Sequence, residues 1–214
     1  MNNRVQTWAE SYNILPESQS RFKKKRSCID NLFVMNTIIQ TALRKNIKGI
    51  YTIFVDFQKA FDSVPHIKLW NKLNDVGVSE KIIRLLKNIY NDAPVRLGVN
   101  NELTEEISIT KGVLQGECTS PLLFALYISD FETYFRNKNL EGYFINQKTD
   151  ILYLQYADDI VIFANTPVDV QHKIIALEEY CIQQELEISV NKTKILHFHR
   201  WETAKQKYEI YLPR

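Results

Sequence analysis

The chain has 214 residues, 45% of them hydrophobic and 24% charged, which is ordinary for a globular protein with one good-sized core or two small ones. Its formal net charge of +2 is too small to indicate nucleic-acid binding, and its three widely spaced cysteines favour neither a disulfide framework nor a zinc site. The sequence shows no signal-peptide core and no apolar run near the roughly 20 residues of a membrane span, so we expect an intracellular protein that does not enter membranes.

The first half of the chain is predicted to alternate helices with one buried strand. Ser27 and Asp30 have the spacing of a capping box, which opens a helix that ends near Lys45. Residues 51–55 form an apolar, β-branched and aromatic run that predicts a buried strand, and Asp56 follows it directly. Two further helices are expected over residues 65–76 and 79–90, on either side of Gly77.

The second half is predicted to hold two hairpins, two helices and a last strand. A short hairpin is expected around Asn100-Asn101, and Pro121 lies in the first turn of a helix over residues 119–137. The other expected elements are strands over residues 94–99, 105–110, 151–155, 160–164 and 195–198 and a helix over residues 168–187. Without repeats or flexible linkers, this order predicts one α+β unit with an antiparallel sheet.

Asp158 and Asp159 stand side by side in the predicted turn of the second hairpin. Adjacent aspartates repel each other and are costly to bury unless a cation or a hydrogen-bond donor compensates. A divalent metal would supply that compensation, and an ordinary solvated turn is the alternative. Asp56 ends a strand that can lie beside this hairpin, which would bring three carboxylates together. Two-metal phosphoryl transfer needs such a cluster, because two Mg²⁺ ions about 3.5–4 Å apart must share oxygen ligands.

Three stretches of the sequence stand out as ordered motifs: Phe54-Val-Asp-Phe-Gln-Lys-Ala-Phe-Asp62, Gly112-Val-Leu-Gln-Gly-Glu-Cys-Thr-Ser-Pro-Leu-Leu-Phe124 and Tyr156-Ala-Asp-Asp159. They resemble successive blocks of reverse transcriptases. Their order and spacing resemble the non-LTR (LINE-type) retrotransposon group, and the Lys-Ala-Phe-Asp continuation of the first block favours that group over retroviral enzymes. Residues 19–30 resemble the basic block of the fingers, and residues 188–194 resemble the block after the acidic hairpin.

The resemblance implies a polymerase palm of the α+β class, with an antiparallel sheet flanked by helices. Residues 1–48, with the basic loop and the first helix, would be a partial fingers segment. Residues 49–214 would be the palm core of one continuous folded unit. The sequence shows no recognisable primer-grip block, thumb, endonuclease domain or terminal zinc knuckle, so we expect a partial domain with the thumb absent.

The same resemblance implies an RNA-directed DNA polymerase that joins a dNTP to a primer 3′-hydroxyl and releases pyrophosphate. Its partners would be an RNA template, a DNA primer and the dNTP, in the nucleus and the cytoplasm. Asp56, Asp158 and Asp159 would be catalytic and would bind two Mg²⁺ ions, for which Mn²⁺ could substitute.

Four more residues receive nucleotide-binding roles from the resemblance. The Phe57 carbonyl would add an oxygen ligand to the nucleotide-side ion. The Phe61 ring would lie beneath the incoming sugar and select deoxynucleotides, because it would clash with a 2′-hydroxyl. Gln115 and Gly116 would lie against the nucleotide or the template base, since an amide both donates and accepts and glycine allows close approach. A core aromatic is the alternative for Phe61, and a turn with a helix cap is the alternative for Gln115-Gly116.

Three cations are candidates for contacts with phosphate. Lys23 and Arg26 belong to a run of five cations in six residues, and they could hold the triphosphate or the template backbone. A solvated basic loop is the alternative. Lys192 would donate a proton to the departing pyrophosphate. A surface lysine is the alternative there, and Lys194 competes for the role.

Two other interpretations stay open. A catalytically incompetent, nucleic-acid-binding remnant would keep the fold and lose polymerisation, because the thumb and the complete fingers are missing. A group II intron-like reverse transcriptase, or another palm polymerase such as a viral RNA polymerase, would use the same acids. Phe61 argues against the use of ribonucleotides.

Overall fold

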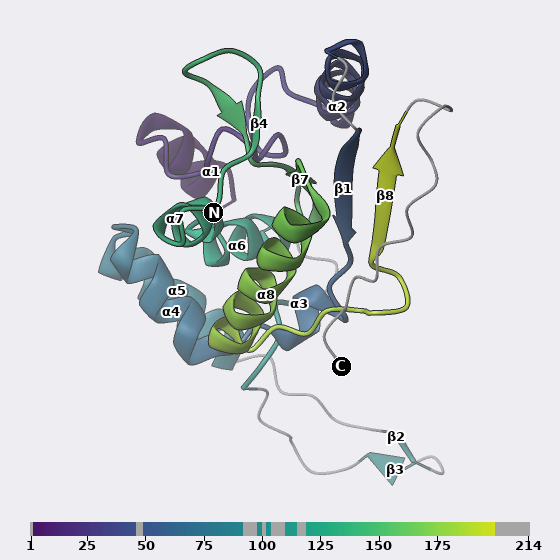
Figure 1. Ribbon diagram of the computed structural model, residues 1–214. Helices are drawn as coiled ribbons and strands as arrows, with labels where there is room; N and C mark the ends of the chain where they lie inside the picture. Colours follow the sequence, from purple (N-terminus) through teal and green to yellow (C-terminus); the bar gives the residue numbers. More distant parts are fainter. Residues whose placement is uncertain are drawn as a thin grey trace.

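A computed structural model describes residues 2–45, 49–91, 98–99, 102–103, 110–114 and 119–199 (Figure 1). None of the helices in this described part is long and apolar enough to cross a membrane. The helices are α1 (Asn2–Ser11), α2 (Cys28–Arg44), α3 (Ala60–Ser63), α4 (His66–Asp75), α5 (Glu80–Asn91), α6 (Ser120–Tyr127), α7 (Phe131–Asn137) and α8 (Pro167–Gln184). The strands are β1 (Ile50–Val55), β2 (Gly98–Val99), β3 (Glu102–Leu103), β4 (Tyr143–Phe144), β5 (Asp150–Ile151), β6 (Tyr153–Tyr156), β7 (Asp159–Ala164) and β8 (Lys194–Phe198).

The central sheet has four strands in the order β6-β7-β1-β8, and every neighbouring pair is antiparallel. In the β1–β7 ladder Val55 lies opposite Ile160, and in the β6–β7 ladder Tyr156 lies opposite Asp159. The strand that ends at Asp56 therefore does lie beside the acidic hairpin. The predicted α+β fold, with an antiparallel sheet flanked by helices, is confirmed.

Alternation along the strands separates two cores, one on each face of the sheet. Ile53 and Ile162, directly opposite each other, face the larger core, to which α6, α7 and α8 contribute. Ile50 and Phe163 face the other way and pack with Ile38 of α2. α2 lies near the start of β1 (Figure 1), and its N-terminal part reaches β6, where the Asn31 side chain donates to the Gln155 carbonyl at 3.0 Å.

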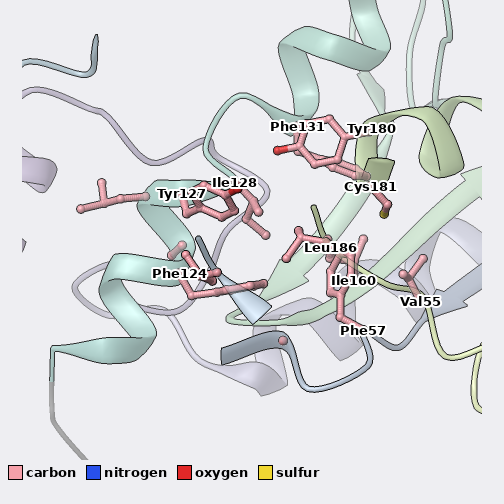
Figure 2. Close-up of a cluster of buried hydrophobic side chains, with 14 of the residues drawn as sticks. Val55, Phe57, Phe124, Tyr127, Ile128, Phe131, Ile160, Tyr180, Cys181 and Leu186 are labelled. Atoms are coloured by element: carbon pink, nitrogen blue, oxygen red, sulfur yellow. The ribbon is translucent and has the colours of Figure 1, made fainter. Parts of the chain in front are cut away.

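Aromatic rings fill much of the larger core (Figure 2). Phe131 of α7 is fully buried, and its ring centroid lies 4.5 Å from that of Phe135, 5.0 Å from that of Tyr153 and 5.1 Å from that of Tyr180. Such ring pairs contribute about 0.5–1.5 kcal/mol each beyond the burial of their area. Because Tyr153 belongs to β6 and Tyr180 to α8, this cluster fixes the strand that leads into the acidic turn.

The prediction of one long helix over residues 119–137 is wrong, because the structure divides it into α6 and α7. The Ser129 hydroxyl donates back to a carbonyl three residues earlier at 2.8 Å, so it competes with the helical hydrogen bonds. The Asp130 carboxylate accepts a hydrogen bond from the Tyr180 hydroxyl at 2.8 Å and another from the Lys72 ammonium. The apolar pattern does not reveal this break, since α6 is buried on nearly all sides.

The other predicted elements differ from the structure only in detail. β1, β8, α2, α4 and α5 agree with the predicted ranges within one or two residues, and α2 has the predicted capping contact, in which the Ser27 N–H donates to the Asp30 carboxylate at 2.6 Å. α8 ends before the predicted residue 187, because Glu185 takes a left-handed φ of 52°. Residue 151 pairs in the separate β4–β5 ladder. The short hairpin, predicted with strands over residues 94–99 and 105–110, is formed by β2 and β3, so its second strand lies earlier than predicted. Residues 94–97 and 104–109 lie outside the described part.

We expect Asp130→Ala to lower the free energy of unfolding by about 1–3 kcal/mol, because the buried Tyr180 hydroxyl loses its hydrogen-bond partner. Urea denaturation measures the change. Tyr180→Phe removes the hydroxyl itself, so Asp130→Ala should cost less in that background. An equal cost in both backgrounds would show that the contact between these two side chains does not support the junction between α6 and α7.

Candidate active site

β6 and β7 are joined by a two-residue loop, Ala157-Asp158, which places the two adjacent acids at one end of the sheet. Tyr156 and Asp159 form the last pair of the ladder. Ala157 has a φ of 60°, in the region that glycine prefers and that tight hairpin loops need. Asp158 is half-buried and Asp159 is exposed. Because a residue with a Cβ is strained at this φ, neighbouring hydrogen bonds must hold the loop.

Asp56 is held at the end of β1 by the segment that precedes β8. Its backbone N–H donates to Oγ1 of the buried Thr193 at 3.2 Å, and its carbonyl accepts from the N–H of Ser189 at 2.8 Å. β1 and β7 are paired up to the last residue of β1. By alternation, the Asp56 side chain leaves the strand on the same face as Asp159.

The three carboxylates act on one another. Partial desolvation of the Asp159 carboxyl group raises its pKa above the ordinary value of 3.8, although the residue as a whole is exposed, and repulsion from Asp158 and Asp56 raises the pKa further. The fold therefore disfavours the ionised form of Asp159. A cation placed between the acids would lower this pKa again.

The carboxylate side chains do not converge on one point. Within the described part of the chain, no group of three or more His, Cys, Asp or Glu side chains is arranged to hold a metal ion. The Asp56 carboxylate instead lies 3.8 Å from the Lys192 ammonium. Three aspartates at adjoining strand ends fit the oxygen chemistry that Mg²⁺ prefers. A bound ion would require these side chains to turn toward one another.

The predicted phosphate-binding cations form ion pairs with acidic side chains. Lys23 and Arg26 both contact Glu17, at 3.0 and 3.4 Å, and the hydrogen bond from Lys23 lowers the pKa of Glu17. Lys192 keeps 73% of its side chain exposed. Exposed ion pairs contribute only about 0–1 kcal/mol, so phosphate could compete for Arg26 and Lys192, whose side chains are exposed. Their roles toward phosphate stay predictions.

Phe57 and Phe61 lie where the site meets the larger core. Each ring meets Phe124 of α6 edge-on, with centroids 6.0 Å apart for Phe57 and 5.4 Å apart for Phe61 (Figure 2 labels Phe57 and Phe124). Phe57 is buried and Phe61 is half-buried. Phe61 therefore has core contacts and also some exposed surface. Gln115 and Gly116 lie outside the described residues.

Three residues to which the sequence assigns no role contact this site. Thr193 anchors the end of β1, and the buried Gln19 bonds the backbone of Ala157. The Arg21 guanidinium lies over the Tyr156 ring, 5.6 Å from its centroid. Buried Gln and Thr give no local signal, because polar residues are expected at the surface. The run of cations is the signal that could have found Arg21.

A cavity of about 510 Å³ lies between α8 and the segment that follows it. It is lined by Gln58, by Glu178, Cys181 and Ile182 of α8 and by residues 186–191. None of the three acids lines it. Burial raises the pKa of the Cys181 thiol to about 12, so this cavity offers no thiolate near neutral pH.

The sequence matches a family model described as reverse transcriptase (RNA-dependent DNA polymerase) over residues 1–211. The chain belongs to this family. Reverse transcriptases generally use divalent metal ions and bind an RNA template and a primer.

Similar curated proteins come from transposable elements. The chain is 28% identical over 185 residues to a Pol polyprotein from retrotransposable element R2 of Nasonia vitripennis, and 27% identical over 181 residues to a 149 kDa protein of transposon TX1 of Xenopus laevis. It is 24% identical over 198 residues to an RNA-directed DNA polymerase from the mobile element jockey of Drosophila funebris. The resemblance to non-LTR retrotransposon reverse transcriptases is confirmed.

These matches cover most of this chain and a small part of each relative. They span 86%, 84% and 89% of the chain, but 18%, 14% and 20% of the R2, TX1 and jockey proteins. The chain therefore corresponds to about a fifth or less of the length of these relatives.

Telomerase structures share the fold of this reverse transcriptase chain. An apo telomerase from Candida tropicalis, truncated from the C-terminal domain, matches with a TM-score of 0.66 and 16% identity, over 96% of this chain and 41% of that one. A telomerase from the same organism in complex with a TWJ fragment of telomeric RNA matches with a TM-score of 0.65 and 14% identity, over 98% and 34%. At these identities the likeness shows the fold alone.

We expect the raised pKa of Asp159 to make the protein less stable as the pH rises. An acid with a raised folded-state pKa binds its proton more tightly in the fold than in the unfolded chain, so stability falls as the pH rises from the unfolded pKa through the folded one. Asp159→Asn removes this ionisation. Its unfolding free energy relative to the wild type should therefore increase between about pH 3 and pH 7, as measured by urea denaturation.

Asp75→Asn on α4 is the matched control for the loss of one carboxylate. Mg²⁺ that binds between the acids should reduce the advantage of Asp159→Asn at neutral pH, because bound ions stabilise the folded wild type. A difference between wild type and Asp159→Asn that stays constant over the whole pH range would contradict the raised pKa.

Proposed function

We propose that the chain is the catalytic part of an RNA-directed DNA polymerase of a LINE-type retrotransposon. It would join a dNTP to the 3′-hydroxyl of a DNA primer on an RNA template and release pyrophosphate, inside the cell, in the nucleus and the cytoplasm. The observation that carries the proposal is that Asp56, at the end of β1, lies at the same end of the sheet as Asp158 and Asp159, at the β6–β7 loop. The family and the transposable-element relatives support it.

Asp56, Asp158 and Asp159 would hold two Mg²⁺ ions, or Mn²⁺, and the Phe57 backbone carbonyl would add a further oxygen. When bound, such ions polarise phosphate oxygens and lower the pKa of an attacking hydroxyl. The main chain of Asp56 is already fixed by hydrogen bonds, so its carboxylate needs only side-chain rotation to reach an ion.

Lys192 would donate the proton to the departing pyrophosphate. Its ammonium lies 3.8 Å from the Asp56 carboxylate, and its exposed stem can swing toward a triphosphate once another cation compensates that acid. Lys194 is the competing candidate. Its ammonium already donates to the Asn191 carbonyl at 2.5 Å, which favours Lys192.

The RNA–DNA duplex would lie on the sheet face that continues from Asp159. Phe54 of β1 and Val161 of β7 are half-buried on this face, and Lys194 and Leu196 of β8 are exposed on it. A duplex held through its backbone and shape needs an open surface beside the acids rather than a pocket that reads bases.

The basic loop over residues 21–26 would contact the triphosphate or the template backbone. Lys23 and Arg26 are held near each other by Glu17, so they present two positive charges from one place. Arg21 would join them, since its guanidinium lies over Tyr156, the residue that leads into the acidic loop.

Asp158→Asn should reduce Mg²⁺-dependent extension of a DNA primer on an RNA template by more than about 100-fold. The substitution keeps the size of the side chain and removes the charge that would bind the ion. Changes outside the direct ligands of a metal already cost about 10–100-fold. Incorporation of a labelled dNTP measures the effect, and Asp75→Asn should extend the primer as the wild type does.

Activity that survives in Asp158→Asn would overturn the metal assignment. Folded wild-type protein that incorporates nothing with Mg²⁺ or Mn²⁺ would favour the nucleic-acid-binding remnant instead. Binding of a labelled RNA–DNA duplex by that inactive protein would then show whether the sheet face near the acids still binds nucleic acid.

Phe61→Ala should raise the incorporation of ribonucleotides relative to deoxynucleotides by about 10–100-fold, because a smaller side chain leaves room for the 2′-hydroxyl. The ratio of the two kcat/KM values measures this selection. Phe135→Leu is the control, since it removes a buried ring of α7 and should leave the ratio unchanged. If Phe61→Ala also leaves the ratio unchanged while it still incorporates deoxynucleotides, the ring is part of the core only.

A further inference from the structure

Gln19 is far from the acids in sequence, but its side chain bonds the loop that carries them. Its Oε1 accepts the N–H of Ala157 at 3.1 Å, and its Nε2 donates to the Ala157 carbonyl at 3.4 Å. The same Oε1 also accepts the N–H of Arg21 at 3.0 Å. Gln19 is 0% exposed. The amide therefore pairs with both polar backbone groups of one loop residue in a site without bulk water.

The main chain around Gln19 is fixed to β6. The N–H of Ser20 donates to the Gln155 carbonyl at 3.0 Å, and the N–H of Gln155 donates to the Ser18 carbonyl at 2.8 Å. The Asn31 side chain, from α2, donates to the same Gln155 carbonyl at 3.0 Å. These bonds extend the sheet by one short parallel bridge and fix the position of the Gln19 amide.

The loop needs such support for two reasons. Ala157 is strained at its φ of 60°, because its Cβ crowds the backbone there. Asp158 and Asp159 also repel each other immediately after it. The Ala157 carbonyl has a second donor, Nε2 of Gln155 at 2.8 Å. Among the described residues, its N–H has Gln19 alone.

We propose that Gln19 is a positioning residue, which fixes the backbone of Ala157 and through it the direction in which Asp158 and Asp159 present their carboxylates to metal ions. The inference rests on the metal role proposed above for these acids. We therefore expect that loss of the Gln19 amide weakens ion binding more than it destabilises the fold.

Mn²⁺ alone is a suitable probe, because the electron paramagnetic resonance signal of the free ion reports its binding to the folded chain. Gln19→Met keeps the length of the side chain and removes both polar atoms. It should weaken Mn²⁺ binding by about tenfold or more, since losing support around metal ligands costs about 10–100-fold. The control is Tyr127→Phe, which removes the part-buried hydrogen bond from the hydroxyl of the buried Tyr127 to the Gln184 carbonyl at 2.6 Å. Tyr127→Phe should leave Mn²⁺ binding unchanged. The melting temperatures of both variants record how much each substitution destabilises the fold.

Hydrogen exchange of the Ala157 amide, followed by NMR, tests the contact without any metal. The wild type should protect this amide, and Gln19→Met should speed its exchange by about tenfold. The Ile162 amide, in the middle of β7, should exchange as it does in the wild type. A general loss of stability would shift the global unfolding equilibrium toward the unfolded state and would speed the exchange of both amides. Comparing the two exchange rates therefore separates a local role of Gln19 from a general loss of stability.

The outcomes are distinct. Wild-type protein that binds no Mn²⁺ would overturn the proposed metal site, whereas Mn²⁺ affinity that is unchanged in Gln19→Met would overturn the role of Gln19 alone. If Gln19→Met does not fold, Gln19→Asn gives the same comparison, because it keeps an amide but is one methylene too short to reach both backbone groups. An Ala157 amide that exchanges freely in the wild type would overturn the proposal without any variant.

Discussion

The pairing of β1 with β7 is the interaction on which the site depends. A slip of one residue in this ladder would turn every side chain of β1 to the other face and would separate Asp56 from Asp159. The register is fixed because Ile53 and Ile162 pack into the larger core on one face and Phe163 packs into the second core on the other. Each such side chain contributes about 1.5–3 kcal/mol when it is fully buried. Apolar packing therefore holds together acids that would otherwise repel one another.

Main-chain hydrogen bonds, rather than opposite charges, support the acids at close range. Thr193 and Ser189 bond the backbone of Asp56, and Gln19 bonds the backbone of Ala157. The ion pair between Lys192 and the Asp56 carboxylate contributes little by comparison, because the Lys192 side chain is mostly exposed. The backbone is thus set in advance while the carboxylates keep their freedom to rotate. Such an arrangement suits a site whose ions arrive with a substrate, since little reorganisation of the protein is then required.

The sheet and the placement of the three acids at adjoining strand ends could be predicted from the sequence because local pattern and tertiary packing agree there, as in the apolar run directly before Asp56. The pattern failed where polar side chains act inside the fold. Ser129 and Asp130 divide a helix that apolar periodicity makes continuous. α1 was missed because only Val5 and Ala9 mark its buried face in a polar sequence. Support from Gln19 or Thr193 could not be foreseen, because a buried hydrogen bond between distant segments leaves no local signal.

The basic loop and the acidic loop share one hydrogen-bond acceptor. Oε1 of Gln19 accepts the N–H of Arg21, in the basic loop, and the N–H of Ala157, beside the acids. The division into a fingers segment and a palm at residue 48 stays a prediction, and these bonds cross it. Val5 of α1 also lies in the same core as the sheet residues of the palm. Because both N–H groups donate to the same oxygen, the loop that would meet phosphate and the turn that would hold the ions form one hydrogen-bonded unit.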